Sequence, residues 1–414
     1  MVSTGQQPIG VVVTGIGVIS ALGNGRAAFE DALFSGVSGI GRVERFDTST
    51  LNCHFGAEAA GFDGANLVRK AEAHLYDRVS LLAMAAADEA IQQAGLNPET
   101  IGPTCGVMMG TAFGPAEAIQ ESVLRYSDNV RLRPTTVVKM MFSGPTAALC
   151  VRFGLEGASS AHVTACAASG HAIAEAVRAV QSGVVEVCLA GGAEAFPSSS
   201  LFAAWDAFGI MSPDSDAEYG IMRPFAADRS GFVIGEAAAV LVLEREDRAR
   251  ARGATILAEV LGSGVVSDAP SLTKPTLRGM VGAMRAALAD SGVTPEEVGH
   301  VNAHATATDL NDALEADAIM EVFGARAQNI PVSACKAAFG HCMGAASAIE
   351  AAATVLSLQR QQAPFVANIR NGEGTLRTAP AMATDVALSN SFAFGGHYVS
   401  LAFRRAQDGF GIVS

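Results

Sequence analysis

Residues 163–171 read Val-Thr-Ala-Cys-Ala-Ala-Ser-Gly-His, and this short stretch is the most informative part of the sequence for the fold. An apolar segment typical of a strand runs into small residues, and an alanine-rich helix then starts at about Cys166 and ends near Gly183. A buried strand followed by a tight turn and a helix is the repeating unit of α/β proteins. The stretch therefore predicts an α/β fold.

The same alternation of buried strands with alanine-rich helices recurs on both sides of this unit. Such a pattern favours mixed or parallel sheets that are covered by helices. The expected strands cover residues 10–15, 106–109, 185–189 (ending at Gly191-Gly192), 237–243, 256–260 and 301–303, and the expected helices cover residues 27–33, 77–94, 280–291 and 344–359.

A charged segment divides the chain. Residues 245–253 read Arg-Glu-Asp-Arg-Ala-Arg-Ala-Arg-Gly and end in a turn signal, after which the strand and helix alternation begins again. We place a domain boundary near residue 255, with an N-terminal half over 1–255 and a C-terminal half over 256–414. No low-complexity linker separates the halves, so we expect them to pack as one rigid body.

Composition excludes several classes of protein. Of the 414 residues 50% are hydrophobic and 17% charged, which suits a large core or an obligate oligomer and not a disordered chain. The net charge of −13 argues against nucleic acid as a partner. An acidic protein could still dock on a local basic patch, although solvated helix faces are the more common explanation of such clusters. The candidates are Arg69 with Lys70, and Arg131 with Arg133 and Lys139.

Targeting signals and cysteine usage point to the cytoplasm. The N-terminus lacks a basic region followed by an apolar stretch, and no apolar run reaches the roughly 18 to 20 residues that a membrane-spanning helix needs. The seven cysteines form no CxxC pair, which indicates reduced thiols. We therefore expect a cytoplasmic protein without a membrane partner.

Residues 15–20, Gly-Ile-Gly-Val-Ile-Ser, superficially resemble a dinucleotide-binding fingerprint. The third small position is Ser20 instead of glycine or alanine, and no acidic residue stands at a second strand end about 20 residues further on. A tight turn after the strand explains the glycines better than a nucleotide site does.

Cys166 is the strongest candidate nucleophile. A thiol at a helix N-terminus lies at the positive end of the helix dipole, which is expected to lower its pKa and raise the thiolate fraction. Small neighbours would also let a thioester approach. Cys150 and Cys188 lack this setting and are expected to be buried and inert, which is the usual state of a cysteine.

Two histidines could serve such a nucleophile. His304 follows a predicted strand in a run of small residues and hydroxyls, and His341 precedes an alanine-rich helix. A lone histidine is more often structural, but two at such junctions favour chemistry. We expect structural roles for His162, His171, His300 and His397, and surface positions for His54 and His74.

A zinc site would use the same residues. Cys166, His304, His341 and Cys342 are possible ligands, but metal ligands usually come partly in short local pairs. Because the adjacent His341 and Cys342 would point to different sides of a helix start, we set zinc aside and expect no metal of this kind.

Together these stretches resemble the β-ketoacyl-(acyl-carrier-protein) synthase family, in particular the elongating type II enzymes and the ketosynthases of type II polyketide systems. The resemblance runs from Val11 to Phe403. It is carried by the Thr-Ala-Cys-Ala turn, by Asn302-Ala303-His304 with Asn311, Asp312 and Glu315, by Lys336 to His341 with Glu350, by residues 228–236, and by Phe392-Ala393-Phe394-Gly395-Gly396.

The resemblance implies a thiolase-like fold with five αβαβα layers in two similar halves, and a dimer formed with itself or with a ketosynthase-like partner. It also implies a decarboxylative Claisen condensation. Cys166 would take an acyl group from the phosphopantetheine of an acyl carrier protein, while His304 and His341 would stabilise the enolate formed from a malonyl thioester as carbon dioxide leaves. No cofactor beyond the carrier's phosphopantetheine is implied.

The resemblance assigns further roles by position. Backbone N–H groups of Cys166 and Phe394 would form an oxyanion hole, and Lys336 would order the histidines through a salt bridge to Glu350. Asp312 and Glu315 would support these residues. The substrate-binding set would be Thr306 and Thr308 for the pantetheine arm, with Phe113, Phe392 and Gly395. A monovalent cation could lie among four residues, although a plain hydrogen-bonded polar cluster is the better explanation for them: Asn302, Glu350, Ser389 and Asn390.

The sequence also departs from the family pattern. Ala305 and Ala393 replace glycines, and the second of these could stiffen a gate beside Phe394. His397-Tyr398 stands where Thr-Asn is common, and Cys335 and Cys342 are expected to be packing residues.

Phe113 falls where the family lines the acyl pocket near the dimer contact. A ring there would block long saturated chains, which favours short or unusually shaped acyl groups and a specialised pathway, such as type II polyketide synthesis, over general fatty-acid elongation.

Three alternatives remain at this stage. A chain-length partner subunit would lack the nucleophilic cysteine, which this chain keeps. Another thiolase-fold acyltransferase would transfer acyl groups without loss of carbon dioxide, and an unrelated cysteine hydrolase would release free acid.

Overall fold

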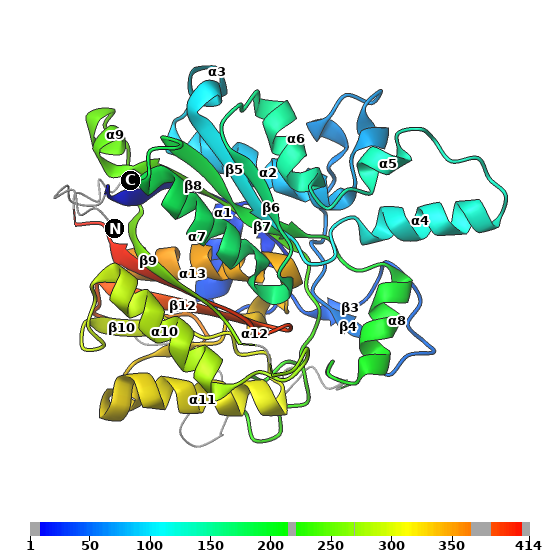
Figure 1. Ribbon diagram of the computed structural model, residues 1–414. Helices are drawn as coiled ribbons and strands as arrows, with labels where there is room; N and C mark the ends of the chain where they lie inside the picture. The colour runs from blue at the N-terminus through cyan, green and yellow to red at the C-terminus, as the bar shows by residue number, and fades with distance from the viewer. Residues whose placement is uncertain (1–8, 214–220, 269, 366–381, 408–414) are drawn as a thin grey trace.

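One mixed sheet of eleven strands runs through the residues that the structure describes, which are 9–213, 221–268, 270–365 and 382–407 of this computed structural model (Figure 1). The strand order is β11-β10-β12-β13-β9-β1-β8-β7-β5-β6, with β2 paired to β1. Residues 1–8, on which the targeting prediction partly rests, lie outside the described residues. The strands are β1 (Val11–Ser20), β2 (Gly23–Asn24), β5 (Cys105–Gly110), β6 (Ser159–His162), β7 (Val187–Glu194), β8 (Ala237–Arg245), β9 (Ala258–Ser267), β10 (Val298–Asn302), β11 (Val332–Ser333), β12 (Val386–Ala393) and β13 (His397–Arg405), while β3 (Gly41–Arg42) pairs separately with β4 (Phe55–Gly56).

The sheet consists of two halves with the same topology. In the N-terminal half the order is β1-β8-β7-β5-β6, and in the C-terminal half it is β9-β13-β12-β10-β11. In each half the first two pairings are antiparallel and the last two are parallel. The halves join where β1 meets β9, through Val12 opposite Glu259 and Val13 opposite Ala258. The prediction of two similar α/β halves is confirmed.

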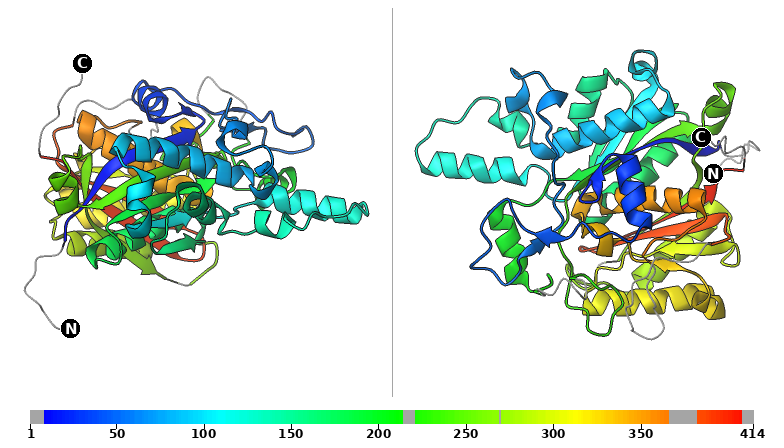
Figure 2. Two further views of the ribbon diagram at one scale, coloured as in Figure 1. Left: turned by 90° about the horizontal axis from the view of Figure 1, so that it is seen from above. Right: turned by 180° about the vertical axis from the view of Figure 1, so that it is seen from behind.

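Helices form three layers around these strands (Figure 1). The helices α7 and α13 contact each other and strands of both halves, so they form the central layer. The helices α2 and α10 lie on the outer faces of the N-terminal and C-terminal halves, and Figure 2 shows the same layering from above and behind. The helices are α1 (Arg26–Phe34), α2 (Arg78–Ala94), α3 (Pro98–Ile101), α4 (Ala116–Ser127), α5 (Thr136–Lys139), α6 (Gly144–Phe153), α7 (Ala168–Gln181), α8 (Ser199–Phe208), α9 (Glu246–Ala251), α10 (Leu277–Ser291), α11 (Asp309–Phe323), α12 (Lys336–Phe339) and α13 (Ala346–Arg360), with 3-10 turns η1 (Ala65–Leu67), η2 (Ala73–Leu75), η3 (Gly102–Thr104), η4 (Ala165–Ala167), η5 (Gly324–Gln328) and η6 (Met343–Ala345).

The segment that resembled a dinucleotide fingerprint belongs to β1, and the predicted turn there is wrong. All ten residues of β1 are buried, as expected of a strand covered on both faces. A side chain on Gly15 would lie 2.1 Å from the Ala90 carbonyl oxygen, and one on Gly17 would lie 1.8 Å from that of Ala86. The glycines therefore allow α2 to pack directly against the strand.

The other predicted elements differ from the observed ones mainly at their ends. The five predicted helices correspond to α1, α2, α7, α10 and α13, and Asp77 caps α2 by accepting a hydrogen bond from the Val79 N–H. The strand predicted at 185–189 continues through both glycines to Glu194, because β7 pairs with β5 and β8 over its whole length. The strand predicted at 256–260 starts at Ala258 and runs to Ser267. Among the described residues, no helix is both long and apolar enough to span a membrane.

Candidate active site

Cys166 lies on a short turn that feeds the central helix α7. It is the middle residue of η4, and Ala165 before it adopts a left-handed backbone conformation with φ of 50°. This is an uncommon conformation for a residue with a side chain, and such strain concentrates at functional positions. The turn presents the Cys166 side chain at the N-terminal end of α7, where the sequence predicted it.

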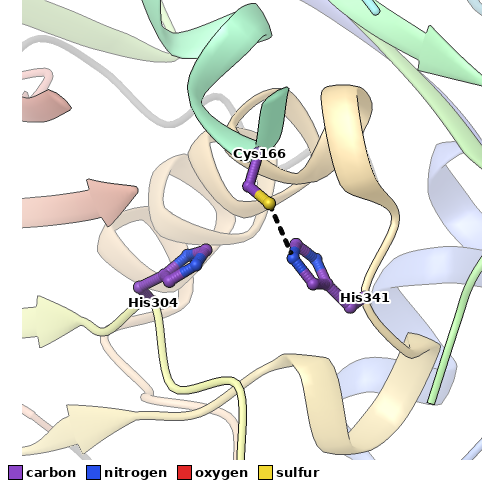
Figure 3. A group of neighbouring side chains, drawn as sticks. All are labelled: Cys166, His304 and His341. Carbon is purple, nitrogen blue, oxygen red and sulfur yellow. Dashed lines mark hydrogen bonds between the residues drawn. The ribbon is translucent and has the colours of Figure 1, made fainter. Parts of the chain in front are cut away.

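The two predicted histidines face this thiol from the C-terminal half (Figure 3). Cys166 Sγ lies 3.1 Å from His341 Nε2, and the rings of His304 and His341 stand 5.4 Å apart and nearly perpendicular. One ligand-type atom of each of the three residues lies within 4.8 Å of those of the other two. The structure thus brings the three predicted residues into one group.

The expected activation of the thiol at rest is wrong. Burial raises the pKa of Cys166 to about 12, and the positive charge of Lys336 offsets only part of this effect. Cys166 is only 9% exposed, so desolvation of the thiolate outweighs the groups that would stabilise it. Burial likewise lowers the pKa of His341 well below its usual range. The resting pair is therefore a protonated thiol next to a neutral imidazole.

Lys336 selects the tautomer of His304. Its ammonium group donates to Glu350 Oε1 at 2.6 Å and to the His304 carbonyl oxygen at 2.6 Å, and lies 3.3 Å from His304 Nδ1. Burial, then Lys336, lowers the pKa of His304 well below its usual range. Since Nδ1 faces a donor, the proton of the neutral ring is on Nε2. The salt bridge from Lys336 to Glu350 is present, and both side chains are fully buried.

Glu315 and Asp312 hold the backbone around His304. Glu315 accepts the N–H groups of His304 at 2.7 Å and Ala305 at 2.8 Å, while Asp312 accepts that of Ala307 at 3.1 Å. Burial raises the pKa of Glu315 to about 7 and that of Asp312 to about 6, and these hydrogen bonds act in the opposite direction. Both carboxylates accept hydrogen bonds from the backbone, and neither lines the cavity next to His304 and His341.

A cavity of about 390 Å³ opens over the three reactive side chains. Thr306 and Thr308 line it, and their hydroxyl oxygens lie 2.9 Å apart. Phe392 and Phe394 line it as well, whereas Gly395 does not. Other residues around the cavity, beyond those already named, include Trp205, Phe208, Arg229, Phe232, Asn311 and Met343.

Phe113 lies behind this cavity and not in it. Together with Trp205 and Met343 it lines a second cavity of about 10 Å³, and the last two residues line both cavities. The rings of Phe113 and Trp205 meet edge to face, 5.8 Å apart, and Trp205 stacks on Phe394 at 6.2 Å. Trp205 therefore separates the reactive cavity from the small void behind it, and Phe113 supports Trp205 from the far side, so that the two rings form one wall.

The possible cation cluster does not form a single set of side-chain ligands. Ser389 accepts a hydrogen bond from Asn302 Nδ2 at 3.4 Å, whereas Asn390 accepts one from Ser400 at 2.9 Å. Ser389 and Asn390 are adjacent in β12, so their side chains point to opposite faces of the sheet. Glu350 Oε2 has no hydrogen-bond partner among the described residues.

The zinc alternative loses its fourth residue. Cys342 Sγ lies 3.4 Å from the Phe339 carbonyl oxygen and packs in the core, as expected for a packing residue. The remaining three side chains have the spacing of a metal site, but the Lys336 ammonium beside His304 disfavours a second cation.

Residues predicted to be structural differ in burial. His300 is fully buried and its Nε2 lies 2.7 Å from Ser333 Oγ. His54 and His74, expected at the surface, are half-buried, and so is Cys150, which was expected to be buried. Half-buried positions are also found for His162, His171 and His397.

Sequence reasoning missed two residues near the site. Trp205 is the sole tryptophan of the chain, and its rarity was a signal that could have singled it out. Glu194 ends the apolar run of β7, and a carboxylate in such a run needs hydrogen-bond partners.

A buried cysteine from one α/β half that faces two histidines from the other, similar half defines a thiol-dependent acyl-transferring enzyme of the thiolase-like class. The sequence matches "Beta-ketoacyl synthase, N-terminal domain" over residues 10–249 and "Beta-ketoacyl synthase, C-terminal domain" over residues 257–370. The chain belongs to the beta-ketoacyl synthase family and is an acyltransferase.

Relatives agree with this placement. The chain is 38% identical over 408 residues to 3-oxoacyl-[acyl-carrier-protein] synthase 2 of Synechocystis sp. (strain ATCC 27184 / PCC 6803 / Kazusa), covering 96% of this chain and 98% of that protein. The ishigamide ketosynthase/chain length factor has a TM-score of 0.89 at 31% identity, covering 97% of this chain and 100% of that one. A type II PKS acyl-carrier protein in complex with its ketosynthase bound to the hexaketide gives 0.87 at 27% identity, covering 97% and 100%.

Proposed function

We propose that this enzyme is a β-ketoacyl-(acyl-carrier-protein) synthase that condenses an acyl group on Cys166 with a malonyl group on acyl carrier protein, with loss of carbon dioxide. The observation that carries the proposal is the triad: a thiol 3.1 Å from one imidazole, with a second neutral imidazole opposite. The relatives described above support the reaction class.

In the loading step the protonated thiol of Cys166 donates to His341 Nε2, which takes the proton as the sulfur attacks the acyl thioester. A carbon–sulfur bond forms to Cys166, the one to the pantetheine sulfur breaks, and His341 returns the proton to that sulfur. The raised pKa of Cys166 makes this base necessary.

In the condensation step the malonyl carboxylate leaves as carbon dioxide, and the electron pair stays on the thioester as an enolate. Nε2–H groups of His304 and His341 donate to its oxygen. The enolate carbon attacks the acyl carbonyl, whose oxygen is held by the N–H groups of Cys166 and Phe394. The sulfur of Cys166 leaves as a thiolate, and it becomes a thiol again by taking one proton from solvent water.

The two histidines differ in a way that suits these steps. Lys336 fixes His304 as a donor at Nε2, whereas His341 Nδ1 has no partner among the described residues. Because nothing there fixes its tautomer, His341 can accept from the thiol during loading and donate to the enolate during condensation.

Substrate groups would arrive on pantetheine, with the Thr306 and Thr308 hydroxyls positioned to bind that arm. The enzyme would then need no cofactor of its own. A wall of Phe113 and Trp205 favours short or unusually shaped acyl groups over long saturated ones, and so a specialised pathway such as type II polyketide synthesis.

The proposed partners are an acyl carrier protein and a second ketosynthase-like chain, identical or not. The strand β6 ends the strand order within the described residues, so its free edge suits pairing with another chain. The projecting α4–α5 arm (Figure 1) exposes Val123, Leu124, Tyr126, Val137 and Val138. For the acidic carrier, the candidate docking sites are the exposed pairs Arg69 with Lys70 and Arg131 with Arg133, whereas Lys139 is half-buried and pairs with Glu121.

The seven free cysteines suit a reducing compartment, which supports a cytoplasmic location.

The decisive experiment is mass spectrometry of carrier-bound products after incubation with a graded set of acyl thioesters and malonyl carrier protein. A product longer by two carbons and carrying a 3-oxo group supports the proposal. Acyl transfer to Cys166 without loss of carbon dioxide, or release of free acid, would overturn it.

A further inference from the structure

One buried carboxylate gathers five hydrogen-bond donors behind the reactive cavity. Glu194, the last residue of β7, is 2% exposed. Its Oε1 accepts from Thr111 Oγ1 at 3.1 Å, Phe113 N at 3.0 Å and Gly114 N at 3.0 Å, and its Oε2 accepts from Ala112 N at 2.6 Å and Gly344 N at 2.9 Å. No Lys or Arg lies within ion-pair distance of it in the described part of the chain.

Four of the donors belong to one turn. Residues 111–114 follow β5, and their three consecutive N–H groups at 112, 113 and 114 all point at the Glu194 carboxylate. This turn places the Phe113 ring edge to face against Trp205. The fifth donor, Gly344, belongs to η6, whose first residue Met343 lines both cavities. The carboxylate therefore ties together the segments that carry Phe113 and Met343.

The carboxylate has no capacity left for a substrate. Each of its oxygens already accepts two or three hydrogen bonds, which uses the available lone pairs. A buried carboxylate costs several kcal/mol unless it is satisfied in this way, so the position is expensive to maintain. Burial raises the pKa of Glu194 to about 7, and the N–H donors from the 112–114 turn and Gly344 lower it. Because Glu194 is unfavourable to bury and has no free lone pair for a ligand, we expect its role to be the positioning of the residues that donate hydrogen bonds to it.

We infer that Glu194 is a positioning residue for chain-length selection: it fixes the 111–114 turn so that the Phe113 ring supports Trp205, which closes the end of the Cys166 cavity. This inference rests on the proposed function, because it concerns the acyl chain carried by Cys166. It assigns to Glu194 no contact with substrate and no part in the reaction steps.

The experiment measures acylation of Cys166 by mass spectrometry, with acyl thioesters of short and long saturated chains, in a double-mutant cycle of Glu194→Gln and Phe113→Ala. A glutamine has one acceptor oxygen and presents an NH₂ group to backbone N–H donors, so the turn should loosen. We expect the ratio of long-chain to short-chain loading to rise by about tenfold in Glu194→Gln, the size of one lost charge-assisted hydrogen bond. In the Phe113→Ala background the same substitution should leave the ratio within about twofold.

A ratio unchanged by Glu194→Gln, or changed equally with and without Phe113, would overturn the inference. Equal loss of loading for every chain length would indicate a purely structural role and would also overturn it. Thr111→Val provides a milder variant if Glu194→Gln does not fold, because it removes one donor to Oε1 and should shift the ratio in the same direction by a smaller factor. Failure of the proposed function is a separate result, namely no 3-oxoacyl product from the wild-type enzyme that nevertheless loads Cys166.

Discussion

The two halves of this enzyme contain the same turn, and only one of them carries the nucleophile. In the N-terminal half η4 leads into α7, and in the C-terminal half η6 leads into α13. Both turns begin with a residue in the left-handed region, Ala165 with φ of 50° and Met343 with φ of 40°. The next residue is Cys166 in one turn and Gly344 in the other.

The difference lies in what faces each turn. Cys166 points into the reactive cavity, whereas a side chain on Gly344 would lie 2.2 Å from the Ala112 backbone nitrogen. The helices that follow also differ, since Glu350 on α13 stands where α7 has Ala172, and both positions are fully buried. The N-terminal turn therefore provides the nucleophile. The C-terminal turn provides close packing, and the helix that follows it carries Glu350, the ion-pair partner of Lys336.

The largest effect should come from removing the only reactive group of the N-terminal turn. Cys166→Ala should lower condensation by more than about 10⁴-fold, because the acyl-enzyme cannot form. Decarboxylation of malonyl carrier protein should persist, since His304 and His341 remain in place. Carbon dioxide release and product formation, measured side by side, test this. Condensation above about one per cent of wild type would show that another group carries the acyl chain.

The next effect concerns the ion pair between Lys336 and Glu350, since the N-terminal half has the uncharged Ala172 at the position of Glu350. Lys336→Met leaves Glu350 buried without a partner, which should lower the free energy of unfolding by about 3–5 kcal/mol. Adding Glu350→Leu should restore most of this stability, because an apolar pair replaces the charges. Activity should stay low in the double variant, since His304 Nδ1 has lost its donor. Urea unfolding and decarboxylation assays separate the two outcomes, and a double variant with normal decarboxylation would contradict the role of Lys336.

A smaller loss of stability is expected at the C-terminal turn. Gly344→Ala forces the added methyl group against the backbone of residues 111 and 112, which should cost about 1–3 kcal/mol. The control is Gly282→Ala on α10, where the nearest atom to the new methyl group would be 3.7 Å away, and which should be neutral or stabilising. If thermal unfolding shows equal effects for both variants, the close packing of the second turn is not what requires glycine.

Much of this fold and site could be predicted from local patterns. The Thr-Ala-Cys-Ala turn, the alanine-rich helices and the small residues around His304 and His341 all have a local signature, and each is found where expected. What failed depends on neighbours distant in sequence. The Gly15–Ser20 segment continues as strand because β8 pairs along it and α2 packs on its glycines. The pKa of Cys166 rises because several elements bury it together, and no short motif records that.

The raised pKa of Cys166 predicts how the rate of its alkylation depends on pH. With a pKa near 12, Cys166 is mostly protonated at all usable pH values, so its thiolate fraction rises about tenfold for each pH unit. Alkylation by iodoacetamide should therefore accelerate from pH 6 to pH 9 without levelling off. The Cys166→Ala protein supplies the background rate of the other cysteines. A plateau within that range would mean a thiolate at rest, as the helix terminus alone would suggest.

The smallest expected effect is a change in tryptophan fluorescence, which reports the contact between the two halves. Trp205, from the N-terminal half, stacks on Phe394 from the C-terminal half at 6.2 Å and touches Phe113 at 5.8 Å. Because Trp205 is the sole tryptophan, its fluorescence observes this contact alone. An acyl chain on Cys166 must share the cavity with these rings, so loading should shift or quench the emission. In Phe394→Ala the unloaded enzyme should already have altered emission, and loading should change it less. Identical responses in both proteins would mean that the acyl chain leaves the stacked rings of Trp205 and Phe394 in place. The wall of Phe113 and Trp205 would then act separately from the gate beside Phe394.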